Sequence, residues 1–260
     1  MTINSFSFVA TKPCHREADI LIWSIRQFYE QPIVVLCDSP TAEHLSSRGH
    51  QNIVLKIQAN PEQMNRDAVR HLETFNRFHN KAAILKKMDV IKIAVDEYSN
   101  TMFFDADIVL TDEIHQDINK PNMFSPHYFH LTKEHQSWNY GAFNAGYVFV
   151  SDPKFHETWK KIYLSHSRFY EQEGMALLFG HYEIGKFNKK HNIGRWRVQN
   201  PSKIVEEFLF PYSIHCHFDP KAYLNANKTL SHHFKSWSEY WIDKVNPELR
   251  KYIKDAINLG

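Results

Sequence analysis

Two aspartates, Asp105 and Asp107, have the spacing that points most directly to chemistry in this sequence. They stand in the segment FFDADIVLTD, after an apolar run at residues 101–104 that is typical of a buried strand. Because alternate side chains on a strand share a face, we expect both carboxylates on one side of the strand's carboxyl end, with Ala106 pointing the other way. Two neighbouring carboxylates repel each other unless a cation lies between them. The spacing therefore predicts a site for Mg²⁺ or Mn²⁺, and the alternative is a solvated turn that caps the next helix.

A second candidate is the segment YGAFNAGYVFVS at residues 140–151, where small residues lead into an apolar strand. The small residues permit close approach of the backbone to a ligand, and Asn144 offers a paired donor and acceptor for sugar hydroxyls. Alternatively, Asn144 satisfies its own backbone at a tight strand entry, and on the residues alone this second interpretation is the stronger one. A helix is expected to follow, with Ser151 or Asp152 as its N-cap.

An acidic triplet, Glu171, Gln172 and Glu173, begins the segment EQEGMALLFG. The pattern predicts a helix whose Met175, Leu178 and Phe179 face the core. Acidic residues in a first turn complement the helix dipole, which by itself explains the triplet.

The C-terminal segment LSHHFKSW contains two adjacent histidines, His232 and His233. A neutral imidazole commonly joins two carboxylates around a metal ion, so either histidine could supply a third ligand, and Lys235 could reach a diphosphate. The alternative is a structural cluster in which Trp237 packs over histidines on a strand. Two further, poorer candidates for the metal lie upstream, namely His215 and His217.

The elements that must position these residues alternate between strand and helix, which indicates an α/β fold. The first sixty residues are typical of a βαβαβ unit, with strands at 5–10, 33–37 and 53–57 and a helix at 17–29. Such a unit implies a mostly parallel sheet with ligands at the carboxyl ends of the strands. The residues expected near the base or ribose of a nucleotide are therefore Ala10, Thr11, Lys12 and Asp38.

Apolar residues then recur at helical spacing over residues 84–98, which predicts a long amphipathic helix that ends at Ser99 and Asn100. Arg77 and Lys81 precede this pattern and could meet phosphate or uracil, although as solvated charges they would be ordinary. The sequence contains no G-x-G-x-x-G and no P-loop motif, so neither a usual dinucleotide site nor a P-loop is expected.

Composition sets the outer bounds on function. With 260 residues, 43% of them hydrophobic, the chain can bury a sizeable core, and we expect a single domain over residues 1–260. A formal charge of +2 does not indicate nucleic acid or an anionic membrane as the main partner. Three scattered cysteines predict no disulfide framework, and no segment approaches the roughly 20 apolar residues of a membrane span. We therefore expect a soluble, cytoplasmic protein.

The order of four segments, NKAAILKKM, FFDADIVL, FNAGYVFV and YEQEGMALL, resembles the GT-A class of glycosyltransferases and, within it, the retaining enzymes of family 8. The tail HHFKSW instead resembles family 32. This resemblance implies a GT-A fold with a mostly parallel central sheet flanked by helices. The nucleotide-binding half would cover residues 1–110, and the acceptor half, with its metal-site tail, residues 111–260.

The resemblance also implies roles for the candidate residues. Asp105 and Asp107 would hold Mn²⁺ or Mg²⁺ against the diphosphate of a nucleotide-sugar donor, with UDP favoured as the nucleotide. Asn144 would line the sugar pocket, and Gln172 would lie beneath the anomeric carbon in a retaining transfer to a glycan or other hydroxyl acceptor. Glu171 and Glu173 would bind the sugar. Aromatic residues suited to stacking on an acceptor sugar are Tyr128, Phe129, Trp138 and Tyr140.

Three other classes of protein remain possible from the sequence. FFDADIVLTD also looks like the nucleophile motif of haloacid-dehalogenase phosphohydrolases, in which Asp105 would be phosphorylated and Asp107 would act as acid and base. That motif lies near the start of those enzymes, whereas here about a hundred residues precede it. Nucleotidyltransferases share the sheet, but their glycine-rich N-terminal loop is missing. A non-catalytic protein that binds sugar nucleotides is the third class, although a decayed site would not be expected to keep all of these polar residues.

Overall fold

The computed structural model describes residues 1–58, 81–115, 118–127, 141–167, 171–194 and 212–215. The chain divides into two compact units. Unit 1 comprises Met1–His15, Glu30–Ala106 and Gln116–Lys189, and unit 2 comprises Arg16–Tyr29, Asp107–His115 and Lys190–Gly260. The expected single domain over residues 1–260 stays a prediction.

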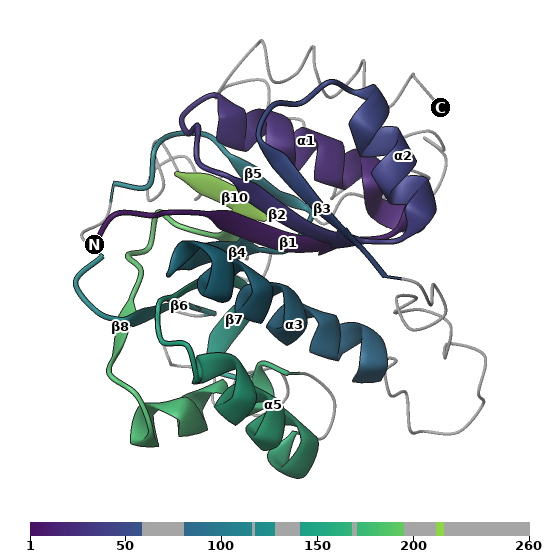
Figure 1. Cartoon of the computed structure of the whole chain (residues 1–260). Helices are drawn as coiled ribbons and strands as arrows, with labels where there is room; N and C mark the ends of the chain where they lie inside the picture. Colours follow the sequence, from purple (N-terminus) through teal and green to yellow (C-terminus); the bar gives the residue numbers. More distant parts are fainter. Residues whose placement is uncertain (59–80, 116–117, 128–140, 168–170, 195–211, 216–260) are drawn as a thin grey trace, which may run out of the picture. The chain divides into compact units, whose positions relative to one another are not determined.

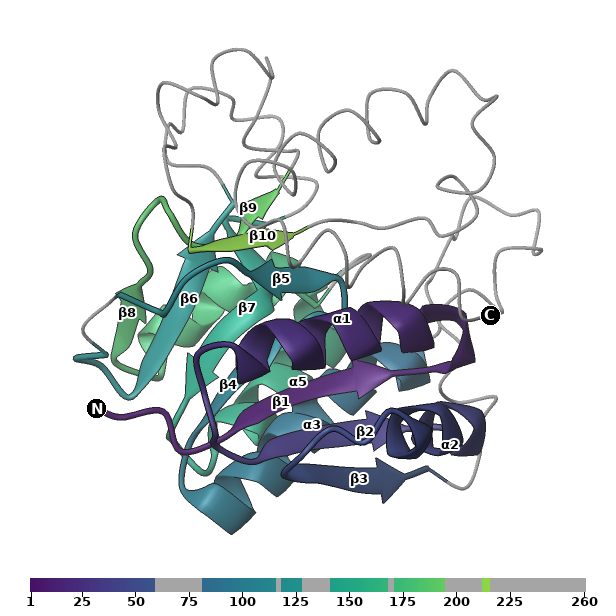
Figure 2. The same ribbon diagram turned by 90° about the horizontal axis from the view of Figure 1, so that it is seen from above.

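Unit 1 is built on a seven-stranded sheet with the order β3-β2-β1-β4-β7-β6-β8 (Figure 2). Its strands are β1 (Phe6–Ala10), β2 (Ile33–Cys37), β3 (Ile53–Ile57), β4 (Thr101–Phe104), β6 (Asn122–Pro126), β7 (Phe143–Val150) and β8 (Ile184–Lys186). Neighbours pair in parallel except at β7, which runs antiparallel to both β4 and β6. The α/β class and the mostly parallel sheet are therefore confirmed.

Helices cover both faces of this sheet. Helices α3 (Lys81–Tyr98) and α5 (Phe155–His166) lie on one face, and α2 (Ser39–Ser47) lies on the other (Figure 1). The core under α3 and α5 contains fully or almost fully buried side chains from helix and strand, including Met88, Ile91, Phe103 and Trp159. Neighbouring residues on a strand point to opposite faces, so Phe104 packs on the other side, 5.0 Å from the ring of Tyr147 between centroids.

The strands and helices arise for the reasons that the sequence suggested, with shifts at some ends. Asp38 caps α2, because its Oδ1 accepts a hydrogen bond of 3.0 Å from the backbone N–H of Thr41. The expected cap at Ser151 or Asp152 is wrong, since α5 begins at Phe155. There the side chain of Asp152 accepts from the backbone N–H of Lys154 at 2.8 Å and closes a turn before the helix.

Unit 2 contains a three-stranded sheet with the order β5-β10-β9. Strand β10 (Ser213–His215) pairs antiparallel with β5 (Ile108–Leu110) and parallel with β9 (Ile193–Gly194). Helix α1 (His15–Arg26), expected at residues 17–29, is joined to β5 by a buried hydrogen bond of 3.1 Å from the Leu110 N–H to the hydroxyl of Ser24. This bond fixes one end of the strand that follows the aspartate pair.

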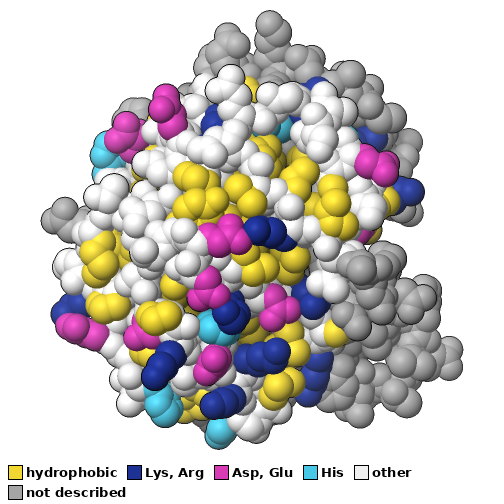
Figure 3. Space-filling model, viewed as in Figure 1, with side chains coloured by type: hydrophobic (Ala, Val, Ile, Leu, Met, Phe, Trp, Pro, Cys, Tyr) yellow, Lys and Arg dark blue, Asp and Glu magenta, His cyan; other side chains and the backbone are white. Residues whose placement is uncertain are grey.

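Charged side chains of both signs lie close together on the face shown in Figure 3. Helix α3 contributes several such pairs, including Lys86 with Asp89 at 3.1 Å and Lys92 with Asp96. The Lys92–Asp96 pair is exposed and therefore contributes little to stability. Among the described helices, none is long and apolar enough to cross a membrane.

Candidate active site

The aspartate pair lies where the chain passes from one sheet to the other. Asp105 follows β4, and its backbone N–H still donates to the carbonyl of Gly146 on β7 at 2.9 Å. The chain then turns at Ala106 and Asp107, and β5 begins at the next residue. Asp105 therefore belongs to unit 1 and Asp107 to unit 2. The strand expected at residues 101–104 ends directly before Asp105, and Asp107 follows in the turn, two residues farther along the chain.

Asp105 is paired with a lysine of α3. The Nζ of Lys87 lies 2.7 Å from Oδ1 of Asp105 and 2.6 Å from Oε1 of Glu171. The side chains of Lys87, Asp105 and Glu171 are only 16%, 22% and 7% exposed, so water screens these charges less than it would on the surface. One buried cation thus holds two carboxylates of the predicted site in unit 1.

There is no room for a larger side chain at Gly146, because the carboxylate of Asp105 lies against it. A Cβ on Gly146 would overlap Oδ2 of Asp105 and would lie 2.7 Å from its Cγ and 3.0 Å from Oδ1 of Asn144. The small residues of FNAG were expected to let a ligand approach the backbone closely. In the described structure, the side chains of Asp105 and Asn144 approach Gly146 in this way. Any larger residue at Gly146 must displace one of them.

Asn144 is held in one orientation by a buried network. Its Oδ1 accepts from the N–H of Gly146 at 2.9 Å, and its Nδ2 lies 3.2 Å from Nε2 of His127. Nδ1 of His127 lies 2.8 Å from the carbonyl oxygen of Gly141, which can only accept, so Nδ1 carries a hydrogen. Nε2 of the neutral ring then accepts from the amide of Asn144. Asn144 thus accepts from the local backbone, as one of its two interpretations expected. Its contact with a sugar stays a prediction.

The acidic triplet lies against the start of β7. Oε1 of Gln172 accepts a long hydrogen bond of 3.4 Å from the N–H of Ala145, and Gly141 adopts φ +80° directly beside the Gln172 carbonyl. Only glycine adopts such a backbone conformation easily, and an added Cβ would overlap that carbonyl. This close packing brings Gln172, together with Glu171, to the Asp105 region of unit 1. Their proposed contacts to a sugar stay predictions.

Glu173 opens a 3-10 helix, η3 (Glu173–Gly180), where an ordinary helix was expected. Met175 and Leu178 are buried as expected, whereas Phe179 is 37% exposed, and its ring stacks on the edge of the core against Phe143. Burial, followed by the charges of Glu171 and Glu173, raises the pKa of the neighbouring Tyr163. The two glutamates of the triplet therefore lie close enough to Tyr163 to favour its protonated form.

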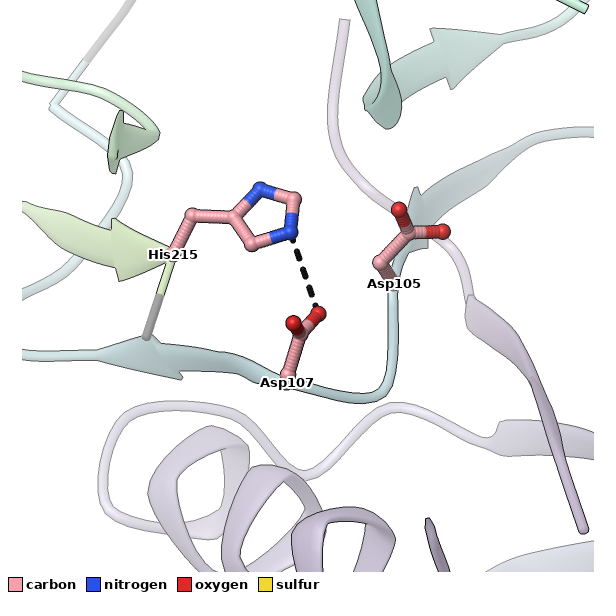
Figure 4. A group of neighbouring side chains, drawn as sticks. All are labelled: Asp105, Asp107 and His215. Carbon is pink, nitrogen blue, oxygen red and sulfur yellow. Dashed lines mark ion pairs between the residues drawn. The ribbon is translucent and has the colours of Figure 1, made fainter. Parts of the chain in front are cut away.

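In unit 2, His215 joins Asp107. Nε2 of His215 lies 3.1 Å from Oδ1 of Asp107 (Figure 4). Nδ1 of His215 lies 3.0 Å from Oδ1 of Asn192. The amide oxygen of Asn192 can only accept, so Nδ1 carries a hydrogen, and Nε2 faces the Asp107 carboxylate, whose oxygen can also only accept. Two facing acceptors are stabilised only by a cation, which is either a proton or a metal ion.

These residues fit a divalent ion. Two ligands about 2.1 Å from Mg²⁺ and at right angles are roughly 3 Å apart, which is close to the separation of the His215 nitrogen and the Asp107 oxygen. Asp107 and His215 lie beside each other within unit 2, and the D-x-D spacing adds Asp105, two residues before Asp107, as a third possible ligand. Carboxylates suit Mn²⁺ or Mg²⁺, and histidine is a common ligand of divalent metal ions in proteins. His215, one of the poorer candidates in the sequence, is therefore the candidate histidine that the described structure places beside Asp107.

The ends of the first two strands are joined to each other. The Lys12 N–H donates to Oδ2 of Asp38 at 2.9 Å, while Oδ1 of Asp38 serves as the α2 cap. The N–H of Thr11 donates to the sulfur of Cys14, in the short helix η1 (Lys12–Cys14), at 3.2 Å. Ala10 ends β1 and is buried. A nucleotide at this sheet edge stays a prediction.

Lys81, a predicted donor contact, is the exposed first residue of α3. The remaining candidates lie outside the described residues: Arg77, Tyr128, Phe129, Trp138, Tyr140, His217, His232, His233, Lys235 and Trp237.

The sequence interpretation missed Lys87, His127 and Asn192. Lys87 gave a usable signal, because it follows Ile84 by three residues and precedes Ile91 by four, so it lies on the buried side of α3. A lysine at core spacing calls for a buried anionic partner. The other two residues gave no such signal, because their partners are distant in sequence.

The sequence matches no protein-family model and no curated protein sequence. The structure, however, is similar to solved glycosyltransferases. It superimposes on galactosyltransferase LgtC, in complex with donor and acceptor sugar analogs, with a TM-score of 0.57 and 15% identity over 95% of this chain and 99% of that chain. The glycosyltransferase GlyE of Streptococcus pneumoniae TIGR4 gives a TM-score of 0.52 and 10% identity over 98% of this chain and 63% of that one.

Mouse xyloside xylosyltransferase 1 gives a TM-score of 0.50 and 10% identity over 81% of this chain and 97% of that chain. Identities this low establish the fold alone. The predicted GT-A fold is thereby confirmed, while membership of family 8 or family 32 stays a prediction.

Proposed function

We propose that this protein is a glycosyltransferase that moves a sugar from a nucleotide-sugar donor to a hydroxyl acceptor with the help of a divalent metal ion. The observation that carries the proposal is the Asp107–His215 pair, whose two facing acceptors are 3.1 Å apart in a chain with a glycosyltransferase fold. The pair needs a cation between its two acceptors, and in a chain with this fold we propose that the cation is a metal ion rather than a proton on His215. The D-x-D spacing adds Asp105 as a further carboxylate.

Asp105, Asp107 and His215 would hold Mn²⁺ or Mg²⁺. When bound, this ion supplies positive charge that stabilises the diphosphate as it leaves the sugar. The aspartates fix the ion through oxygen, and His215 adds a neutral nitrogen. His232 and His233 remain candidates for this site as well.

Lys87, Glu171, Gln172 and Asn144 would face the donor sugar. Lys87 neutralises Glu171 and Asp105, so donor phosphates meet a less negative site. Gln172 would lie beneath the anomeric carbon, as the family 8 resemblance implies, with Glu171 and Glu173 on the sugar hydroxyls. The leaving diphosphate can accept the proton of the acceptor hydroxyl, so a retaining transfer requires no further base among these residues.

The nucleotide, for which UDP is the first choice, would lie at the carboxyl ends of β1 and β2, near Ala10, Thr11, Lys12 and Asp38. Lys81, Lys235 and Trp237 are additional candidates for donor contacts. A glycan or another hydroxyl compound would be the acceptor. A cytoplasmic location belongs to the same proposal, and the free thiols of Cys14 and Cys37 support a reducing compartment.

A thermal-shift screen tests this proposal. The melting temperature is measured with a panel of nucleotide sugars and free nucleotides, each with and without Mn²⁺, because a ligand of the folded state raises it by mass action. We expect a metal-dependent increase with one nucleotide sugar, and the size of the increase identifies the donor. An increase with none of them at saturating concentrations would contradict donor binding.

A further inference from the structure

Asn192 is a buried asparagine in unit 2 whose environment is built around one hydrogen bond. It is fully buried, precedes β9 directly, and adopts a left-handed backbone conformation with φ +54°. Its side-chain oxygen lies 3.0 Å from Nδ1 of His215. Asparagine tolerates this backbone region better than most residues, which by itself could explain its presence. The side-chain contact requires a second explanation.

The backbone of Asn192 is fixed independently of its side chain. Its N–H donates to the hydroxyl of Ser213 in a buried hydrogen bond of 2.7 Å. Ser213 begins β10, the strand that ends at His215, and β10 pairs with β9 through Ile214 and Ile193. Two neighbouring strands therefore hold the amide of Asn192 and the ring of His215 in one register.

The direction of the Asn192–His215 hydrogen bond decides which ring nitrogen can bind a metal. With the amide oxygen facing Nδ1, the neutral ring carries its hydrogen at Nδ1, and the lone pair is at Nε2. Nε2 is the atom that faces Asp107 at 3.1 Å. A histidine ligand commonly donates its other ring N–H to an oxygen that fixes the ring, and loss of that partner weakens metal binding.

We infer that Asn192 is a positioning residue that presents Nε2 of His215 to the metal ion, so that it sets the affinity of the site without touching the ion. The inference rests on the proposed function, because it needs a metal at Asp107 and His215. It goes further by assigning a role to a residue that is more than eighty positions from the aspartate pair. The carboxamide oxygen of Asn192 makes the contact with His215, and the left-handed backbone conformation places that oxygen.

Three substitutions separate the contribution of the Asn192 side chain from that of its backbone conformation. Asn192→Gly removes the carboxamide but accepts φ +54° without strain, and it leaves the N–H to Ser213. Asn192→Asp keeps an oxygen that accepts from Nδ1. Asn52→Gly is the matched control, because Asn52 has φ +52° and its side chain donates to an exposed backbone carbonyl, that of Glu30, at 2.8 Å.

The first measurement is the dissociation constant of Mn²⁺ alone, from electron paramagnetic resonance of the free ion. Asn192→Gly should weaken binding roughly 10- to 100-fold, the scale typical of lost outer-shell partners. Asn192→Asp and Asn52→Gly should remain within about 3-fold of the wild type. If the glycine variant does not fold, Asn192→Ser, whose side chain is too short to reach His215, takes its place with the same expectation.

The control Asp107→Asn distinguishes the two proposals. Loss of Mn²⁺ in Asp107→Asn with unchanged affinity in Asn192→Gly would overturn the role of Asn192 and leave the metal site intact. Equal Mn²⁺ binding in the wild type and Asp107→Asn would overturn the metal site, and the role of Asn192 with it.

The second measurement uses diamagnetic Mg²⁺ in place of Mn²⁺. The ¹⁵N chemical shifts of the His215 ring report which nitrogen carries the hydrogen. With saturating Mg²⁺ we expect the hydrogen at Nδ1 in the wild type and in Asn192→Asp, and in Asn192→Gly a mixture of both tautomers. The same Nδ1–H ring in the glycine variant as in the wild type would overturn the inference.

Discussion

The ammonium group of Lys87 lies 2.7 Å from Oδ1 of Asp105, so a cation of the protein already occupies one side of the aspartate that is proposed to bind a metal. The same ammonium lies 2.6 Å from Glu171. With Lys87 in place, two partly buried carboxylates remain close together without a bound ion. Lys87 therefore keeps the unit 1 part of the site folded before any ligand arrives.

Replacement of Lys87 by methionine should destabilise the protein. The change keeps most of the apolar stem but leaves Asp105 and Glu171 without their shared cation, at a cost of about 1–3 kcal/mol. Breaking a fully buried ion pair would cost more stability than this. The three side chains are partly exposed to water, so the expected loss stays within this range. Urea denaturation at low salt measures the loss.

Lys92→Met is the control for this variant. Lys92 pairs with Asp96 four residues away, and both side chains are about half exposed, so the loss of this pair should change stability much less than the loss of Lys87. Equal losses of stability in the two variants would show that the Asp105–Lys87–Glu171 arrangement stabilises the protein no more than a surface ion pair.

Gly146→Ala should disturb the site more than the fold. The new Cβ would overlap the Asp105 carboxylate, which is the movable end of a side chain, so the carboxylate is displaced while the strand remains. We expect weaker Mn²⁺ binding with a small decrease in melting temperature. Gly180→Ala, which places a Cβ in open space, should change neither quantity. Wild-type Mn²⁺ affinity in Gly146→Ala would exclude Asp105 as a ligand.

Asn144→Asp should be destabilising although it is nearly isosteric. The new carboxylate still accepts from the Gly146 N–H, but its second oxygen faces Nε2 of His127, which is itself an acceptor. A lost hydrogen bond with two facing acceptors costs on the order of 1–3 kcal/mol. Thermal and urea unfolding check this value, and unchanged stability would contradict the assigned tautomer of His127.

His156 on α5 predicts a pH dependence away from the site. Burial lowers its pKa below the ordinary value of about 6.5. The unfolded state therefore takes up the proton first as the pH falls, so the contribution of His156 to stability is present above pH 6.5 and is lost as the pH decreases through the folded pKa. Between about pH 7.5 and pH 5, the wild type should lose more stability than His156→Gln. Parallel losses in both proteins would contradict this prediction.

Local patterns predicted much of the fold. Apolar runs separated by turn residues located β2, β3 and β4 at their observed bounds, and helical spacing located α3. These elements form from short-range preferences that the sequence displays directly. The α5 start was missed because Asp152 can cap either a helix or a turn, and only the tertiary structure decides between them.

The site was less accessible to sequence reasoning. FFDADIVL is apolar on both sides of the aspartates, so nothing local shows that the chain leaves one sheet after Asp105 and enters another after Asp107. The pairing of His215 with Asp107 likewise depends on β10 lying beside β5, a contact between strands about a hundred residues apart. Alternation along a strand cannot predict such long-range pairings.

Release of nucleoside diphosphate from nucleotide sugars is the measurement that tests the central claim most directly. The wild-type protein is incubated with each donor of a panel, first with Mn²⁺ and then with excess chelator, beside Asp107→Ala. We expect release from one donor that requires Mn²⁺, is abolished by the chelator, and is absent in Asp107→Ala, whose fold should remain intact because the change removes a negative charge from a crowded site. Undiminished release by Asp107→Ala, or no release from any donor by the folded wild-type protein with Mn²⁺ and an acceptor panel, would contradict a metal-dependent glycosyltransferase.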